Sequence, residues 1–275
     1  MTYRQLIQEL EDHLEAIGEE KEALTFAFKE LKKWSLTDFA FHQAKEVSSE
    51  DQLLLATIFD HLSKHQPVQH YLGYSYFKDL TLIVSPDVLI PRPETEELVD
   101  LILAQHPAQS LSVLDIGTGS GAIALALKAN RPDWQITALD ISKTALEIAS
   151  DNGEKLGLKI RWLQSDLFSQ VSDKFDIIVS NPPYISKEDQ DEVGKNVLSH
   201  EPHLALFADK QGYAIYEQII SEADRFLKDK GTLYFEIGYK QGQRVKEMLE
   251  KAFPKSQVVL LKDSFGKDRM VVLQK

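Results

Sequence analysis

The chain has 275 residues, a length that predicts one large domain and a smaller one, and its 43% hydrophobic and 27% charged residues are typical of a folded protein. It has no cysteine, which excludes disulfides, thiolate nucleophiles and sulfur-ligated metal centres, and its net charge of −12 opposes non-specific binding to nucleic acids or anionic membranes. No apolar run reaches the roughly 18 residues of a membrane span, and the acidic N-terminal segment does not resemble a secretory signal, so we expect a cytoplasmic protein without membrane association.

Residues 1–65 predict a small domain of short amphipathic helices, because apolar residues recur at helical spacing and no segment alternates like a strand. Two segments match the S/T-x-x-Q capping box that begins a helix: Thr2 to Gln5 and Ser49 to Gln52. The domain has 7 Lys and Arg against 13 Asp and Glu, hence a net charge of −6. Two interpretations of this charge stay open: solvated helix faces, or a surface that docks a basic partner.

Residues 66–92 are rich in aromatic and β-branched residues around Lys78 and Asp79, which predicts a β-hairpin that links two domains. From residue 93 to residue 275, helix and strand patterns alternate. The predicted strands are 112–116, 135–140, 160–164, 175–180, 231–237, 256–263 and 269–274. Such alternation is typical of an α/β fold with a doubly wound, mainly parallel sheet.

A glycine-rich turn follows the first of these strands directly. It consists of Gly117, Thr118, Gly119, Ser120 and Gly121. Asp140 ends the next strand, where its carboxylate can accept hydrogen bonds from the two hydroxyls of a ribose. The spacing differs from both the dinucleotide and the P-loop patterns, so we predict a nucleoside site that is not centred on phosphate. The alternative is a structural turn, with Asp140 merely preceding a helix.

The most specific motif is Asn181-Pro182-Pro183-Tyr184, which follows the apolar strand 175–180. Two consecutive prolines fix φ and remove two N–H donors, so the loop is rigid and presents acceptors. The Asn181 oxygen and the Pro182 carbonyl are suited to accept both hydrogens of a planar NH2 group, with the Tyr184 ring packed on its face. The alternative is a proline-stiffened turn.

Together these motifs resemble the class I S-adenosylmethionine-dependent methyltransferases that modify planar nitrogen. Further segments extend the match: residues 67–69, 88–96, 201–206, 236–238 and 268–269. With them the chain resembles the HemK/PrmC family of protein-(glutamine-N5) methyltransferases, over roughly residues 67–273. Members of that family methylate the glutamine of the GGQ motif in class I peptide chain release factors, which modulates translation termination.

The resemblance implies S-adenosyl-L-methionine as methyl donor and S-adenosyl-L-homocysteine as product. It assigns the glycine turn to the methionine and ribose side, Asp140 to the ribose hydroxyls, and Asp166 and Leu167 to the adenine. It assigns Asn181, Pro182, Pro183 and Tyr184 to substrate binding and catalysis, with Asn181 also contacting the cofactor. Many relatives have tryptophan at the position of Leu167 and tyrosine at that of His70.

From the same resemblance we expect a release factor as protein partner, recognised by the helical domain, and a monomer that binds no nucleic acid directly. No histidine pair has metal-ligand spacing, so we expect no metal. Two rival functions stay open. One is methylation of an adenine or cytosine amino group in nucleic acid, which would use the same Asn-Pro-Pro-Tyr motif on a flipped base; the other is a non-catalytic nucleoside-binding or translation-factor adaptor that only docks a partner through its helical domain. The net charge of −12 disfavours the first, and the intact Asn181 motif disfavours the second.

Overall fold

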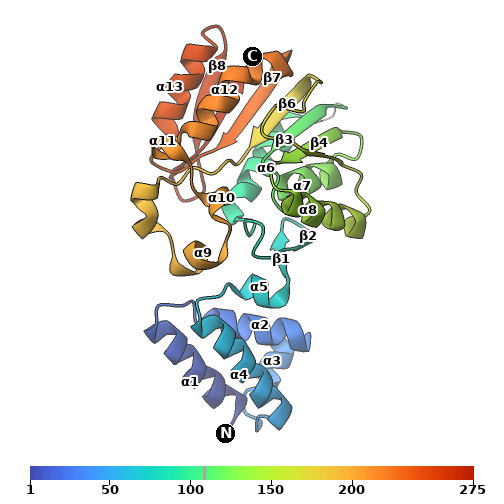
Figure 1. The fold of residues 1–275 in the computed structure, drawn as a ribbon. Coiled ribbons are helices and arrows are strands. Elements are labelled where there is room, and N and C mark those ends of the chain that lie inside the picture. Colours follow the sequence, from blue (N-terminus) through green and yellow to red (C-terminus); the bar gives the residue numbers. More distant parts are fainter. Residues whose placement is uncertain (108–109) are drawn as a thin grey trace. The chain divides into compact units, whose positions relative to one another are not determined.

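The computed structural model describes residues 1–107 and 110–275, which form two compact units (Figure 1). The first unit comprises Met1–Tyr74 and Val193–His200, and the second comprises Ser75–Glu192 and Glu201–Lys275. The functional domains predicted at 1–65, 66–92 and 93–275 stay predictions. Within the described ranges, no helix is both long enough and apolar enough to cross a membrane.

The first unit is helical and encloses its own core, in which Leu14, Phe28 and Leu55 are fully buried. The predicted capping box of the first helix is confirmed, because the side chains of Thr2 and Gln5 each accept the other's backbone N–H. The helices of this unit are α1 (Tyr3–Ala16), α2 (Glu22–Lys32), α3 (Leu36–His42), α4 (Ser49–Ser63), α5 (Val68–Leu72) and α9 (Lys195–His200).

Two local predictions in this region are wrong. The N-cap of α4 is Ser48 rather than Ser49, since the Ser48 side chain accepts the backbone N–H of Asp51 at 3.1 Å. The same Asp51 is buried and accepts a hydrogen bond of 2.7 Å from the ammonium of Lys32, so a tertiary contact holds this first turn in place. In addition, residues 68–72 form the short helix α5 inside the segment that we expected to be part of the hairpin.

The predicted hairpin itself is present. Its strands are β1 (Tyr74–Phe77) and β2 (Leu80–Ile83), which form a two-stranded sheet. Lys78 in the turn has a positive φ of 52°, the left-handed conformation that a tight hairpin turn requires.

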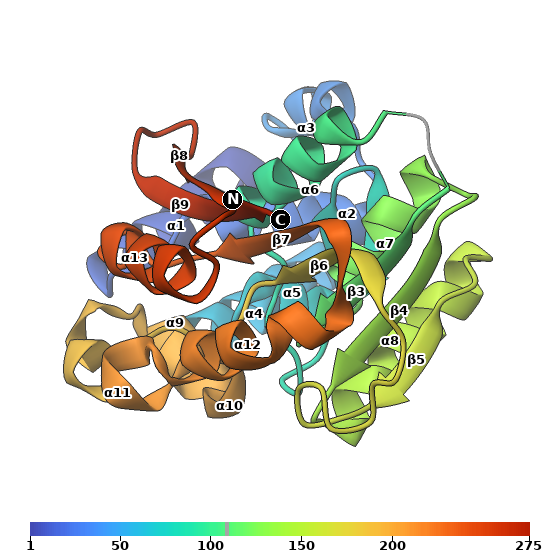
Figure 2. The ribbon, with the colours of Figure 1, turned by 90° about the horizontal axis from the view of Figure 1, so that it is seen from above.

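The second unit contains a seven-stranded sheet in the order β5-β4-β3-β6-β7-β9-β8, seen from above in Figure 2. The strands from β5 to β7 are parallel, and β9 is antiparallel to both its neighbours. This confirms the predicted doubly wound, mainly parallel α/β fold. The strands are β3 (Ser112–Ile116), β4 (Gln135–Asp140), β5 (Arg161–Gln164), β6 (Phe175–Ser180), β7 (Leu227–Glu236), β8 (Gln257–Lys262) and β9 (Asp268–Gln274).

Successive residues of each central strand point to opposite faces of the sheet, which produces two cores. Val113 and Ile177 pack with residues of α6 and α7, whereas Leu114 and Ile178 pack with residues of α12 and α13. The main helices are α6 (Pro93–Gln105), α7 (Ala122–Asn130), α8 (Lys143–Leu156), α12 (Ala214–Phe226) and α13 (Gly242–Ala252). Since β4 and β6 lie on opposite sides of β3, the chain reverses its winding there, and open α/β sheets bind ligands at such a point.

Short helices connect β6 to α12. Those of the second unit are η1 (Lys187–Glu192), α10 (His203–Leu206) and α11 (Asp209–Gly212). A parallel bridge between Ile185 and Phe207 closes this connection on itself. It thereby brings Pro202 and Leu204 to the wall of a cavity at the carboxyl ends of the parallel strands.

Candidate active site

A cavity of about 200 Å³ lies at the carboxyl ends of β3, β4 and β6. Eight predicted site residues line it: Gly117, Gly119, Asp140, Asp166, Leu167, Asn181, Pro182 and Pro183. The structure therefore brings the glycine turn, the predicted ribose ligand and the Asn-Pro-Pro loop together around one space. Four other predicted residues are outside the lining: Thr118, Ser120, Gly121 and Tyr184.

The glycine turn depends on residues that tolerate positive φ. Gly117 and Gly119 have φ of 74° and 56°, and a Cβ at either position would meet no atom within 4 Å. The backbone N–H groups of Gly117 and Thr118 both donate to the carbonyl of Leu139 at 2.9 Å, which fastens the turn to β4. The turn therefore leaves open space where side chains would otherwise stand, and a ligand can approach the main chain closely.

Asp140 has a carboxylate whose direction is fixed by the backbone. Its Oδ2 accepts the N–H of Gly119 at 2.9 Å, and its Oδ1 accepts the N–H of Ser142 at 2.9 Å. Burial raises the pKa of Asp140, and these backbone hydrogen bonds oppose the rise. Each carboxylate oxygen has a second lone pair, so Asp140 can still accept two hydroxyls from the cavity.

A second buried carboxylate, Asp115, lies at the base of the same turn. The hydroxyl of Thr118 donates to it at 2.6 Å. Burial raises the pKa of Asp115 to about 7, against the effect of that hydrogen bond, and the nearby charge of Asp140 adds to the rise. Thr118, which is outside the cavity lining, thus has a structural contact with Asp115.

Leu167, which follows Asp166, contributes an apolar side chain to the cavity lining. Leu167 has a positive φ of 45°, and its carbonyl accepts a hydrogen bond of 2.6 Å from the Ser165 hydroxyl. The same hydroxyl accepts the N–H of Gln170 at 3.1 Å, which closes the loop after β5. An aliphatic wall of this kind can pack on a planar base, although it cannot stack with it as an aromatic ring does.

Asn181 begins the rigid loop immediately after β6. The hydroxyl of Ser180 donates to the carbonyl of Ile116 at 2.8 Å and so ties the end of β6 to β3. The amide Nδ2 of Asn181 donates to the hydroxyl oxygen of Thr95 at 3.2 Å, and the Thr95 hydroxyl donates to Glu236 at 2.7 Å. Our residue assignments included neither Thr95 nor Glu236, although both lie in segments that carry the family resemblance.

Glu236 ends β7 and is 2% exposed. Burial raises the pKa of Glu236 to about 7, while the hydrogen bond from Thr95 and the positive charge of Arg269 oppose the rise. A carboxylate at the end of an apolar strand, one strand away from Asn181, is the signal that could have identified it.

Tyr184 lies against the protein interior beside α12 and α13. Its carbonyl accepts a hydrogen bond of 2.9 Å from Gln241, and a Cβ at Gly212 would lie 2.0 Å from that carbonyl oxygen. A Cβ at Gly238 would lie 3.1 Å from the ring. Burial raises the pKa of Tyr184 to about 12. The ring thus packs against the core and supports the loop from the protein interior. Its predicted contact with the substrate stays a prediction.

The loop before α6 is held by a buried carboxylate. Glu201 accepts the N–H of Ile90 at 3.1 Å and an ion-pair hydrogen bond from Arg92. Glu96 accepts the backbone N–H of Lys78 at 2.8 Å, at the turn of the hairpin. These contacts are structural, and they fix the start of α6, which carries Thr95.

Comparison with known proteins then decides the family. The model of the PrmC N-terminal domain matches residues 4–73, and that of the methyltransferase small domain matches residues 95–206. The release factor glutamine methyltransferase of Streptococcus pneumoniae is 53% identical over 99% of this chain and 98% of its own length. The chain belongs to the release factor glutamine methyltransferase family. The Lactococcus lactis protein of that name is 42% identical over 98% of this chain and 96% of its own length.

A more distant structure agrees in fold. The crystal structure of a methyltransferase from Pyrococcus furiosus superposes with a TM-score of 0.54 at 18% identity, over 80% of this chain and 98% of that one. Membership of the family confirms the resemblance drawn from the motifs and makes the chain a methyltransferase. The roles of individual residues rest on the geometry of the cavity.

Proposed function

We propose that this chain transfers a methyl group from S-adenosyl-L-methionine to the side-chain amide nitrogen of the GGQ glutamine in a class I peptide chain release factor. One observation carries the proposal: Asn181 lines the same cavity as the glycine turn and Asp140. A donor site and an acceptor for a planar NH2 group are therefore adjacent. Family membership supports the choice of a release factor over other amide substrates.

The residues of the cavity fit S-adenosylmethionine. Gly117 and Gly119 leave a cradle that a Cβ would fill, Asp140 offers two acceptor oxygens for the ribose, and Leu167 offers an apolar face for the adenine. When bound, the cofactor supplies an electrophilic methyl group on a positively charged sulfur.

The protein's task is to position a weak nucleophile, because the lone pair of an amide nitrogen is delocalised into its carbonyl. We assign the Asn181 oxygen and the Pro182 carbonyl as acceptors for the two amide hydrogens. These two hydrogen bonds orient the amide nitrogen. They hold it in a geometry in which its lone pair can lose part of its conjugation with the carbonyl. A protonated amide is strongly acidic and loses its proton to water, so no general base is required.

We further assign recognition of the release factor to the helical domain, residues 1–65, with residues 66–92 as linker and 93–275 as the methyltransferase domain. Leu36 and Phe41 support this role, since they are 75% and 71% exposed on α3. We expect the protein in the cytoplasm, because release factors act during translation, and we expect it to be a monomer. The effect on the cell is modulation of translation termination.

The test is methyl transfer from tritium-labelled S-adenosylmethionine to three acceptors: a class I release factor, the same factor with its motif glutamine replaced by glutamate, and duplex DNA. The proposal predicts labelling of the first acceptor only. Labelling of DNA would instead indicate an amino methyltransferase for nucleic acid. Cofactor binding without transfer to the unmodified release factor would identify a non-catalytic adaptor.

A further inference from the structure

Three polar side chains form a hydrogen-bonded series that leads from the cavity into the core. Asn181 Nδ2 donates to Thr95 Oγ1 at 3.2 Å, and Thr95 Oγ1 donates to Glu236 Oε2 at 2.7 Å. Thr95 and Glu236 are 5% and 2% exposed, so water does not compete for these bonds. The three residues come from α6, the loop after β6, and β7.

The charge of Glu236 fixes the direction of every hydrogen bond in this series. An ionised carboxylate can only accept, so it takes the single proton of the Thr95 hydroxyl. The Thr95 oxygen must then accept, and the group that it accepts from is the NH2 end of Asn181. The oxygen end of the Asn181 amide is consequently left for the cavity.

Protonation of Glu236 reverses the series. A carboxylic acid donates to the Thr95 oxygen, and the Thr95 hydroxyl is then free to donate to the oxygen of Asn181. The amide of Asn181 would turn its NH2 group toward the cavity, where the two hydrogens of a substrate amide need acceptors. The orientation that suits catalysis therefore belongs to the ionised state.

We propose that Glu236, acting through Thr95, sets which end of the Asn181 amide faces the substrate. Both are positioning residues for the reaction, and the inference rests on the proposed function of Asn181. It predicts that the chain is a methyltransferase whose rate depends on the ionisation of a carboxylate that touches neither substrate.

The groups around Glu236 place its ionisation in the neutral range. Burial raises the pKa of Glu236 to about 7, and the negative charge of Glu94 on α6 adds to the rise. The hydrogen bond from Thr95, the positive charge of Arg269 on β9 and a hydrogen bond from the Asn181 side chain oppose it, so Asn181 is coupled to Glu236 directly as well as through Thr95. The hydroxyl of Tyr216 on α12 donates to the main-chain carbonyl of Glu236 at 2.9 Å. The negative charge of Glu236 also raises the pKa of the Tyr184 phenol, which follows β6.

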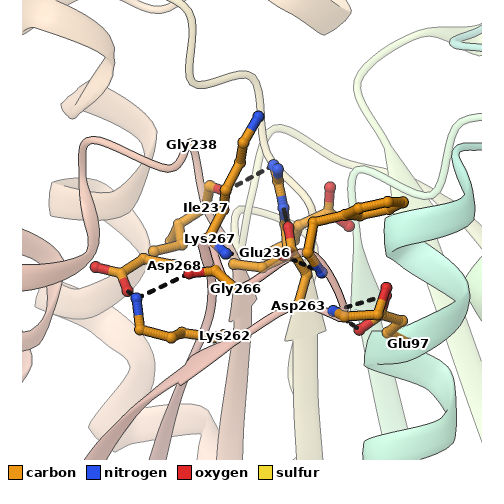
Figure 3. A network of polar contacts seen from close by, with 12 residues as sticks. Glu97, Glu236, Ile237, Gly238, Lys262, Asp263, Gly266, Lys267 and Asp268 are labelled. Carbon is orange, nitrogen blue, oxygen red and sulfur yellow. Dashed lines mark hydrogen bonds and ion pairs between the residues drawn. The ribbon is translucent and has the colours of Figure 1, made fainter.

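The position of Arg269 is itself fixed. Its Nε donates to Asp263 at 3.2 Å and its Nη1 donates to the carbonyl of Ile237 at 3.3 Å. Asp263 also accepts the backbone N–H groups of Phe265 and Lys267, which closes the turn between β8 and β9. Figure 3 shows this network beside Glu236. The hairpin of β8 and β9 at the edge of the sheet thus holds the positive charge of Arg269 in place.

The first test measures kcat and KM for a release factor at several pH values. In the wild type, kcat should fall as the pH drops through about 7, because Glu236 becomes protonated. Glu236→Gln should have a lower kcat without this acidic limb. Thr95→Val should lower kcat by about 10- to 100-fold and change KM and cofactor affinity much less, since misorientation of a reacting group has costs of this size.

Two matched variants control for folding. Thr95→Ser keeps the hydroxyl and should stay within about threefold of the wild-type kcat, whereas a merely steric role would not be rescued by serine. Thr137→Val removes another buried hydroxyl, from the middle of β4 and outside the cavity lining, and should retain wild-type activity. Wild-type kcat in Thr95→Val, or an unchanged acidic limb in Glu236→Gln, would overturn the inference.

A second test needs neither cofactor nor turnover. The side-chain NH2 signals of Asn181 in a ¹⁵N NMR spectrum can be assigned by their loss in Asn181→Ala. They should shift with pH around 7 in the wild type and stay constant in Glu236→Gln. Signals that do not titrate in the wild type would refute the coupling even if methyl transfer is observed. A titrating signal without any methyl transfer would refute the proposed function and leave the coupling intact.

Discussion

Replacement of Asp140 by alanine removes the only carboxylate that we assign to the ribose. In the structure its two oxygens are already aligned by backbone N–H groups, from Gly119 and Ser142, each at 2.9 Å. The carboxylate therefore does not need to reorient when two hydroxyls bind, and little entropy is lost on binding. Alanine removes both acceptors and leaves both N–H groups without this partner.

The expected loss of affinity follows from the charge on the acceptor. A hydrogen bond to a charged group contributes about 1.5 to 3 kcal/mol. At about 1.4 kcal/mol per factor of ten, the loss of one such bond weakens S-adenosylmethionine binding roughly 10- to 150-fold, and Asp140→Ala, which loses two, should weaken it by at least this much. Asp140→Asn should lose less, because it keeps the size of the side chain and one acceptor oxygen.

Isothermal titration with S-adenosylmethionine and with S-adenosylhomocysteine measures this effect. Both ligands contain the same ribose, so the loss should be similar for the two. A thermal melt establishes that each variant is folded. An unchanged Kd in folded Asp140→Ala would refute the ribose assignment, and a loss confined to S-adenosylmethionine would place Asp140 near the sulfonium instead.

Two further predictions concern stability and the partner. Because burial raises the pKa of Asp115 to about 7, the folded state holds a proton that the unfolded state has lost, and stability should fall as the pH rises from about 4 through 7. Asp115→Asn should flatten this decline and raise Tm at pH 8 by several degrees, since 1 kcal/mol corresponds to about 2 to 4 °C. Calorimetry at several pH values measures both effects. A variant whose stability declines with pH in parallel with the wild type would contradict this role of Asp115. Exchange of the exposed Leu36 and Phe41 for serine should raise KM for a whole release factor at least about fivefold while leaving KM for a short GGQ peptide unchanged. Equal effects on both substrates would remove the helical domain from substrate recognition.

The sequence was sufficient to predict those features that depend on local pattern. The strands of the sheet alternate with helices, and the glycine turn and Asp140 end adjacent strands, so their meeting at one edge follows from the topology of a parallel sheet. The short helix α5 was missed, although Pro67 before it and the left-handed Gly73 after it are ordinary boundary signals. In that stretch the aromatic and β-branched residues favour a strand, and we gave them more weight than these boundary signals of a helix.

The rest depends on contacts between distant residues. Ser48 and Ser49 are equally good N-caps locally, and the pairing of Asp51 with Lys32 is part of what distinguishes them. Thr95 and Glu236 are separated by 141 positions and meet only because α6 packs against β7, while Asn181 joins them because β7 lies beside β6 in the sheet. No spacing rule connects such residues before the strand order is known.

The most direct test of the catalytic site is the single-turnover rate of Asn181→Ala, saturated with S-adenosylmethionine, on a class I release factor. The variant loses one acceptor for the substrate amide, at about 1 to 3 kcal/mol, and with it the orientation of the nitrogen. We predict a folded enzyme that transfers methyl groups at least about a hundredfold more slowly than the wild type, with mass spectrometry placing the wild-type product on the glutamine side chain. A near-normal rate in the folded variant would show that the Asn-Pro-Pro-Tyr loop is only a rigid turn and would contradict the assignment of the catalytic site.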